Sequence, residues 1–172
     1  MAFSIVKVYK ESFPNVRFIG KKYTDNDRVN GTFGVKWGEW FSNGWFDILE
    51  KEIKLLPKEY EGNAYLGLMR MNNGVFEYYI GMFAAEDSQL PLGFEYIDIP
   101  AGEVATAWVH GTEDTGELYG SEPTEACISK FNEKGWTVEE SAYFFERYQC
   151  PRFTTPDKDG KVILDYCVYI NV

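Results

Sequence analysis

The order of extended and helical stretches is the same in the two halves of the chain. Each half contains a stretch rich in β-branched and aromatic residues, then an amphipathic helical stretch, then two further extended stretches. This pattern of strand, helix, strand, strand predicts an α+β fold built by tandem duplication, with antiparallel sheets and helices packed on them. The extended stretches are residues 2–10, 15–23, 64–71, 75–84, 94–99, 104–110, 142–150 and 162–172.

Local sequences support this division of the chain. Asn72-Asn73-Gly74 is a good turn sequence between two of the strands, and Ser121-Glu122-Pro123 begins the second helix, which ends before Gly135. The penultimate aromatic strands look alike: Phe76-Glu77-Tyr78-Tyr79 in the first half and Phe145-Glu146-Arg147-Tyr148 in the second. Because no linker separates the halves, we expect one domain over residues 1–172, with repeats at about 1–90 and 91–172.

The first helix is predicted from apolar residues at helical spacing, with Gly44 as a residue that could interrupt it and Pro57 as its end. Trp40 lies off this predicted stripe. The stripe consists of Trp37, Phe41, Trp45, Ile48, Leu49 and Ile53.

Charge and composition exclude several classes of function. The formal net charge of −10 opposes binding to phosphate backbones, so direct nucleic-acid binding is not expected. The longest apolar runs are far shorter than the ~20 residues that cross a bilayer, and the N-terminus lacks a signal-peptide pattern. The three cysteines are odd in number and form no CxxC motif, which indicates free thiols in a reducing cytoplasm.

Aromatic residues make up 17% of the chain, including 12 Tyr and 5 Trp. A plain core of this size needs fewer tyrosines, since each phenol requires a polar partner when it is buried. We therefore expect some of these rings to line a cavity, with the others in the core or at its edge.

A set of short motifs in a fixed order resembles the GyrI-like effector-binding domain, which also forms the ligand-binding half of several AraC- and MerR-type regulators. The resemblance covers about the whole chain, and one departure from it is Asn171, where the family often has Pro. The motifs are Tyr79-Ile80-Gly81-Met82, Ile99-Pro100-Ala101-Gly102-Glu103, Val109-His110-Gly111, Phe145-Glu146-Arg147-Tyr148 and Val168-Tyr169-Ile170-Asn171-Val172.

The resemblance implies two strand-helix-strand-strand units about a pseudo-two-fold axis, with a ligand cavity between the units. Members of the family bind lipophilic, aromatic or cationic small molecules, and a glutamate of the F-E-x-Y strand lies at the pocket floor. The chain has no helix-turn-helix upstream, so we expect a free-standing member. One free-standing subfamily hydrolyses cyclopropane-bearing DNA alkylators inside an aromatic cage, and Lys36-Trp37-Gly38-Glu39-Trp40-Phe41 makes that subfamily a candidate.

Glu146 is the principal candidate for a functional residue. Strand alternation places Phe144, Glu146 and Tyr148 on one face and Phe145 and Arg147 on the other. A carboxylate among aromatic rings can attract a cation, orient a water or accept a proton as general base. The alternative is a glutamate at the solvated end of a strand, or one paired with Arg147.

The other candidate ligand-binding residues are aromatic, because ring faces attract cations and stack on flat guests. Tyr169 takes the position of the family's pocket aromatic, although a core tyrosine fits the same pattern. Tyr119 precedes the second helix, where it either closes a pocket or packs as a helix staple. Further candidates for cage or core are Trp37, Trp40, Tyr79 and Trp108.

Other kinds of site are not supported. His110 is the only histidine, so a Ser-His-Asp or Cys-His set would depend on it alone. No cluster has metal-ligand spacing, Asp157-Lys158-Asp159-Gly160 fits a turn better than a calcium loop, and Gly31-Thr32-Phe33-Gly34 lacks the rest of a phosphate-binding loop. No cofactor or metal is expected.

Three functions follow as hypotheses. The first is binding of a hydrophobic or cationic small molecule, the second is hydrolysis of a cyclopropanoid electrophile with Glu146 as the tentative catalytic residue, and the third is a protein-binding adaptor of gyrase-inhibitor type. The sequence leaves the oligomeric state open.

Overall fold

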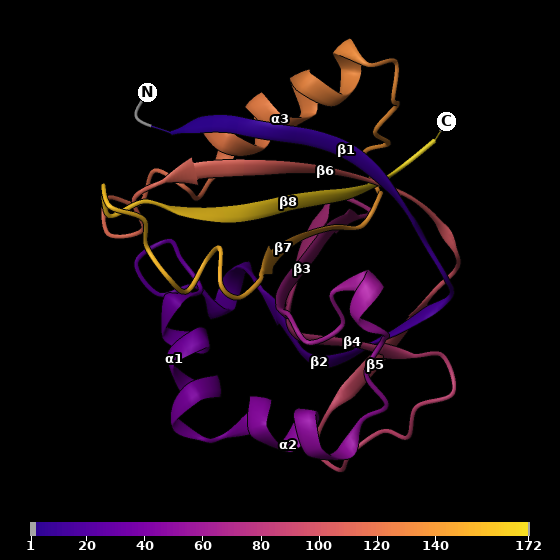
Figure 1. Cartoon of the computed structure of the whole chain (residues 1–172). Helices are drawn as coiled ribbons and strands as arrows, with labels where there is room; N and C mark the ends of the chain where they lie inside the picture. The colour runs from indigo at the N-terminus through magenta and orange to yellow at the C-terminus, as the bar shows by residue number, and fades with distance from the viewer. Residues whose placement is uncertain (1–2, 172) are drawn as a thin grey trace. The chain divides into compact units, whose positions relative to one another are not determined.

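The computed structural model describes residues 3–171, which form two compact units. Unit 1 joins Met1–Phe13 to Gly102–Val172, and unit 2 is Pro14–Ala101. Both units contain antiparallel strands and helices, which confirms the α+β class (Figure 1). Ala2 and Val172, at the ends of two predicted strands, lie outside the described residues. No helix within residues 3–171 is both long and apolar enough to span a bilayer.

Unit 1 has one helix on one face of its strands. The strands are β1 (Ser4–Phe13), β6 (Gly102–Gly111), β7 (Phe144–Tyr148) and β8 (Val162–Ile170), in the order β1-β6-β8-β7. Alternate residues of β6 and β8 pack against α3 (Ser121–Glu133), because side chains along a strand point to opposite faces (Figure 1). The centre of this core is Ala105, Ala107, Val109, Cys127, Phe131, Leu164, Tyr166 and Val168.

Unit 2 has two α-helices beside its strands. The strands are β2 (Val16–Thr24), β3 (Tyr65–Asn72), β4 (Val75–Ala85) and β5 (Glu95–Ile99), in the order β3-β4-β2-β5. The helices are α1 (Gly34–Ser42) and α2 (Trp45–Glu52), with short 3-10 turns at Asp25–Asp27 and Lys58–Tyr60. The predicted hairpin turn is confirmed, with positive φ at both Asn73 and Gly74.

The predicted first helix is two helices, and its buried face differs from the predicted stripe. Gly44 adopts a left-handed conformation with φ of 67° and separates α1 from α2. This break changes which side chains face inward. Phe41 is 60% exposed and Trp40 is fully buried, so the expectation that Phe41 belongs to the core stripe and Trp40 lies off it is wrong.

The first strand of each predicted half pairs outside that half. β1 pairs with β6, and β5 pairs with β2. The compact units therefore differ from the halves 1–90 and 91–172, although the orders β1-β6-β8-β7 and β5-β2-β4-β3 match strand for strand. The prediction that both aromatic strands are the penultimate strands of their halves is wrong. Phe76–Tyr79 lies on β4, the last strand of its half, whereas Phe145–Tyr148 lies on β7, the last but one. The duplication itself stays a prediction.

Gly81 of the Tyr79-Ile80-Gly81-Met82 motif lies where two backbones come close. It pairs with Gly20 across β2 and β4. A Cβ at Gly81 would lie 2.1 Å from the Ile19 carbonyl oxygen, and one at Gly20 would lie 2.0 Å from the Ile80 carbonyl oxygen. Glycine at both positions is therefore a requirement of strand pairing in unit 2.

Candidate functional site

The short strand β7 carries the candidate carboxylate on the face of unit 1 that α3 covers. Phe144 and Tyr148 pack against the α3 core, and the Tyr148 hydroxyl donates a hydrogen bond of 3.0 Å to Glu146 Oε1. Phe145 and Arg147 point to the opposite face, where Phe145 contacts the Phe13 ring and Arg147 bonds Asp165. The predicted alternation along β7 is confirmed. Glu146 is 8% exposed, so its carboxylate is held away from bulk water.

Two further phenols lie near the Glu146 carboxylate. Tyr166 is its cross-strand partner on β8, and Tyr119 lies just before α3. Burial raises the pKa of the Tyr166 phenol, and the negative charge of Glu146 raises it further. Tyr119 is 36% exposed as a residue, and partial burial of its phenol, followed by the charges of Glu113 and Glu146, raises the pKa there. Both therefore stay neutral at ordinary pH. The Tyr166 hydroxyl donates to the Leu118 carbonyl oxygen at 2.5 Å, which fixes the segment that carries Tyr119.

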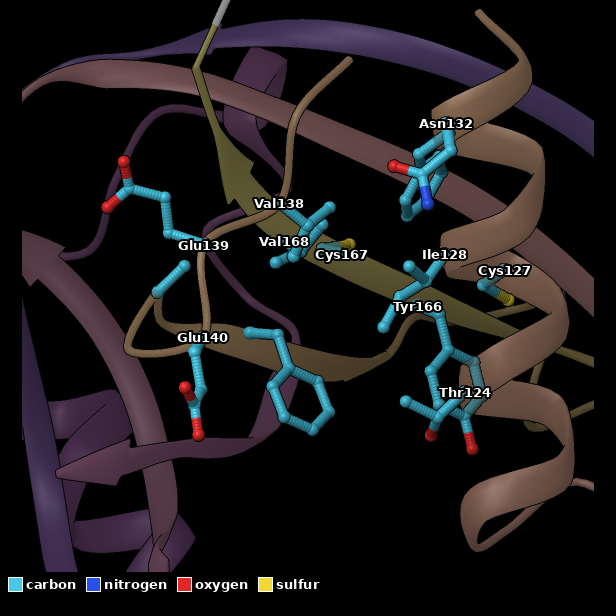
Figure 2. A pocket seen from close by; sticks show the side chains of 13 residues that line it. Thr124, Cys127, Ile128, Asn132, Val138, Glu139, Glu140, Tyr166, Cys167 and Val168 are labelled. Carbon is cyan, nitrogen blue, oxygen red and sulfur yellow. The ribbon is translucent and has the colours of Figure 1, made fainter. Parts of the chain in front are cut away.

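A pocket of about 240 Å³ opens between α3, the 138–142 loop and strands β7 and β8 (Figure 2), and Glu146, Tyr148 and Tyr119 are not among the residues that line it. Glu146 follows Phe144 by two residues on β7 and pairs with Tyr166, and both of those residues line the pocket. The full lining is Thr124, Cys127, Ile128, Phe131, Asn132, Val138, Glu139, Glu140, Ala142, Phe144, Tyr166, Cys167 and Val168.

The pocket is apolar inside and acidic at its rim. Burial raises the pKa of the Cys127 thiol to about 12, so this wall carries no charge. Glu139 and Glu140 are exposed on the loop side, away from α3 (Figure 2). Glu139 accepts a hydrogen bond from Asn171 Nδ2 at 2.5 Å. Aromatic walls with carboxylates nearby suit a guest that is apolar and positively charged.

Trp108 and Tyr169 lie on the opposite face of the unit 1 strands from Glu146. The Trp108 indole donates to the Tyr9 hydroxyl at 3.2 Å, and its ring lies 4.5 Å from Lys7 Nζ. Tyr169 lies against the Phe13 and Phe145 rings, and burial raises the pKa of its phenol. Cys167 and Tyr169 alternate with Tyr166 along β8, so they lie on a different face from Glu146.

The remaining candidates belong to unit 2. Trp40 is fully buried, donates to the Tyr23 hydroxyl at 3.0 Å and contacts the Phe46 ring. Trp37 donates to the Tyr78 hydroxyl at 2.9 Å. Tyr79 is buried on β4, edge-on to the Phe18 ring. Their part in ligand binding stays a prediction, and the structure brings together Tyr119, Phe144, Glu146 and Tyr148 within unit 1.

A buried charge network occupies the face of unit 1 opposite Glu146. Asp165 is fully buried and accepts hydrogen bonds from Arg147 Nε at 2.8 Å and Arg152 Nε at 2.8 Å. Arg147 also bonds Glu11, at 3.1 Å. Sequence patterns alone do not indicate this network or the position of Tyr166. Tyr166 alternates with Cys167 along the last strand, which places the two side chains on opposite faces. Which of these faces carries Glu146 follows only from the pairing of β7 with β8.

His110 bonds Asp157, the first residue of the predicted turn Asp157-Lys158-Asp159-Gly160. His110 Nε2 lies 2.8 Å from Asp157 Oδ2. The hydrogen bond from His110 is the main reason that the pKa of Asp157 is lowered to about 2. Asp157 also accepts from the backbone of Asp159 and Lys161, as in the predicted turn. Within residues 3–171, no group of three or more His, Cys, Asp or Glu side chains has metal-binding geometry.

Comparison with known proteins identifies the fold. No protein family and no curated protein match the sequence. Among solved structures, a Staphylococcus aureus MU50 protein described as a bacterial transcription regulation protein matches with a TM-score of 0.67 and 15% identity, over 96% of this chain and 99% of the other. SAV2435 bound to tetraphenylphosphonium matches with a TM-score of 0.69 and 15% identity, over 96% and 94%. The C-terminal domain of EcmrR matches with a TM-score of 0.58 and 10% identity, over 96% and 97%.

At these identities the comparisons show a shared fold, which is consistent with the predicted GyrI-like fold. Function does not follow from fold alone, so it has to be argued from the residues of the site.

Proposed function

We propose that this protein binds a small lipophilic cation in the unit 1 pocket, with Glu146 supplying the negative charge that the cation seeks. The observation that carries the proposal is a buried carboxylate, bonded by Tyr148, on the strand whose Phe144 lines an apolar pocket and opposite Tyr166, which lines it too. The SAV2435 structure, bound to tetraphenylphosphonium on the same fold, supports the same ligand class.

Electrostatics favours a cation at three levels. The chain has a net charge of −10, which attracts cations over its whole surface. Glu139 and Glu140 stand at the pocket rim. A carboxylate removed from water interacts with a nearby cation more strongly than an exposed one, because the effective dielectric constant is lower. Phe144 and Tyr166 then offer ring faces, each worth ~0.5–2 kcal/mol toward a cation.

The pocket volume limits the guest. About 240 Å³ is below the ~300 Å³ at which drug-sized sites begin. The guest that we propose has one aromatic ring and a compact cationic head. Phe144 lines the pocket, and Tyr119, Glu146 and Tyr148 are proposed to contact the guest from outside that lining. Trp37, Trp40, Tyr79, Trp108 and Tyr169 are further candidates on which this proposal does not depend.

The test is a pair of isosteric ligands that differ in charge. Benzyltrimethylammonium and neopentylbenzene have the same shape, and only the first is a cation. We expect saturable calorimetric binding of the cation and affinity at least about tenfold weaker for the neutral isostere, since one charge interaction near a buried carboxylate is worth 1.4 kcal/mol or more. Equal affinities for the two probes would overturn the proposal. A protein that binds neither of the two probes nor tetraphenylphosphonium would overturn it as well.

A second candidate is hydrolysis of a cyclopropanoid electrophile in the same pocket. The observation that favours it is the Tyr148 hydrogen bond, which fixes one Glu146 oxygen and leaves the carboxylate oriented to accept a proton from water. Water would form a C–O bond to a strained ring carbon and lose its proton to Glu146. The ring C–C bond would break at the same time, and its electron pair would pass to the electron-accepting group conjugated with the ring, which then takes up a proton. Turnover of a cyclopropane-bearing alkylator by the wild type, lost in Glu146→Gln, supports this role; equal rates exclude it. Co-purification of a large protein partner with no ligand uptake would instead favour the adaptor.

A further inference from the structure

Two consecutive residues of the loop after β7 reach opposite faces of the unit 1 strands. Arg152 extends to the face that carries the charge network, where its Nε donates to Asp165 Oδ1 at 2.8 Å. Phe153 extends to the α3 face and packs against the core there. Just after β7 ends, the loop therefore contacts both faces of the strands, one through Arg152 and the other through Phe153; we call this pair of contacts the grip.

The Arg152 end of this grip is firmly anchored. Asp165 is fully buried, and the Arg152 side chain is 17% exposed. The guanidinium also lies 4.7 Å from the centre of the Trp108 ring, a distance typical of cation–π contact. Arg152 Nη2 also donates to Asp165 Oδ2, so two donors hold the guanidinium on the buried carboxylate. This pair has little freedom to shift, because both donors must stay in the carboxylate plane.

Backbone hydrogen bonds hold the loop to the adjacent strands. The Phe153 amide donates to the Gln149 carbonyl oxygen at 2.9 Å, and the Ile163 amide donates to the Arg152 carbonyl oxygen at 2.9 Å. Movement of the Arg152 side chain is therefore transmitted to Phe153 through one short, bonded segment.

The Phe153 end of the grip contacts the candidate site. Its ring meets the Tyr148 ring edge to face, with centroids 4.8 Å apart and planes at 80°. Tyr148 is the residue whose hydroxyl donates to Glu146 at 3.0 Å. A hydrogen bond to a carboxylate is sensitive to donor position, since it weakens steeply as distance and angle depart from the optimum.

We propose that Arg152 and Phe153 form a clamp that fixes the Tyr148 ring and, through it, the orientation of the Glu146 carboxylate. In this assignment Arg152 is a positioning residue for charge recognition, although it lies on the opposite face of the strands from the ligand. Trp108 then acts as the platform for Arg152. The inference rests on the proposed function, because the orientation of Glu146 matters only if the carboxylate meets a cation.

The first test measures charge selectivity, the ratio of the dissociation constants of neopentylbenzene and benzyltrimethylammonium. Loss of stability alone weakens both ligands together and leaves this ratio unchanged. We expect Arg152→Gln, Phe153→Leu and Tyr148→Phe each to reduce the ratio about fivefold, the effect of losing one hydrogen bond of ordinary net strength. Because Phe153→Leu changes no charge, it separates geometry from electrostatics, and it remains informative if Arg152→Gln fails to fold.

Two comparisons make this test specific. Adding Arg152→Gln to Tyr148→Phe should reduce the ratio no further, since the two residues act through the same hydrogen bond. Lys158→Gln removes one positive charge from an exposed position of the same loop and should leave the ratio at the wild-type value. Full additivity in the double variant, or an equal effect of Lys158→Gln, would overturn the clamp.

A second test needs no ligand. The Tyr148 ring resonances, assigned by their loss in Tyr148→Phe, feel the ring current of Phe153. We expect both Phe153→Leu and Arg152→Gln to shift these resonances and Lys158→Gln to leave them in place. If the wild type binds neither probe, the proposed function fails while the resonances still decide the clamp: unchanged Tyr148 resonances in Arg152→Gln would overturn it.

Discussion

Glu77 in unit 2 and Glu146 in unit 1 are both buried on strands beside aromatic side chains, 6% and 8% exposed, yet different groups bond them within their own units. Glu77 lies 2.9 Å from Lys22 Nζ and 3.3 Å from Arg70 Nε, two cations on neighbouring strands. Glu146 accepts its hydrogen bond from the Tyr148 phenol. The two cations balance the charge of Glu77, and the Tyr148 phenol orients the Glu146 carboxylate.

The difference teaches that burial of a glutamate does not by itself indicate a ligand site. Burial raises the pKa of Glu77, but the hydrogen bonds from Lys22 and Arg70 outweigh it, so the pKa is lowered from 4.5 overall. Glu77 therefore acts as a structural anion that joins β4 to β2 and β3. The proposed function assigns recognition to Glu146, which follows the pocket residue Phe144 on β7 and pairs with the pocket residue Tyr166.

The largest predicted contrast is in stability. Glu77→Gln leaves two cations without their carboxylate, and we expect it to lower the free energy of unfolding by about 2 kcal/mol. In Glu146→Gln the amide oxygen can still accept from Tyr148, so we expect a loss below about 1 kcal/mol. Urea unfolding of both variants at pH 7 measures the difference, and equal losses would remove the distinction between the two glutamates.

A smaller effect follows from pH. Because the pKa of Glu77 is lower in the folded chain than its usual 4.5, its ion pairs stabilise the fold fully above that value. This stabilisation is lost as the pH falls through the folded pKa. The stability gap between wild type and Glu77→Gln should therefore narrow to below about 1 kcal/mol under acid conditions. A gap that stays constant from pH 7 down to pH 3 would show that Glu77 does not act through its charge.

Local sequence signals predicted most of the elements and one face of the site. Turn residues placed the β3–β4 hairpin and both ends of α3, and alternation placed Phe144, Glu146 and Tyr148 together. These features depend on residues close in sequence. Helical spacing was compatible with one continuous helix or with a break at Gly44, and the structure has the break. As a result Trp40 is buried and Phe41 is exposed, the reverse of the prediction.

Features that depend on distant pairing could not be predicted. The partner of β1 is β6, about 100 residues away, and the sequence of neither strand indicates that the two pair. The register of β7 on β8 sets Tyr166 beside Glu146 and sends Tyr169 to the opposite face. The path of the loop after β7 brings Arg152 to Asp165 and the Phe153 ring to the Tyr148 ring. The composition of a loop does not specify its path.

The most direct test of the account is the charge selectivity of Glu146→Gln compared with that of Glu77→Gln, each measured by calorimetry with benzyltrimethylammonium and neopentylbenzene. We expect Glu146→Gln to lose about tenfold or more in affinity for the cation and to bind the neutral isostere as the wild type does. Glu77→Gln should keep the wild-type ratio. An unchanged ratio in Glu146→Gln, or the same loss in both variants, would contradict the claim that Glu146 is the carboxylate that recognises the ligand.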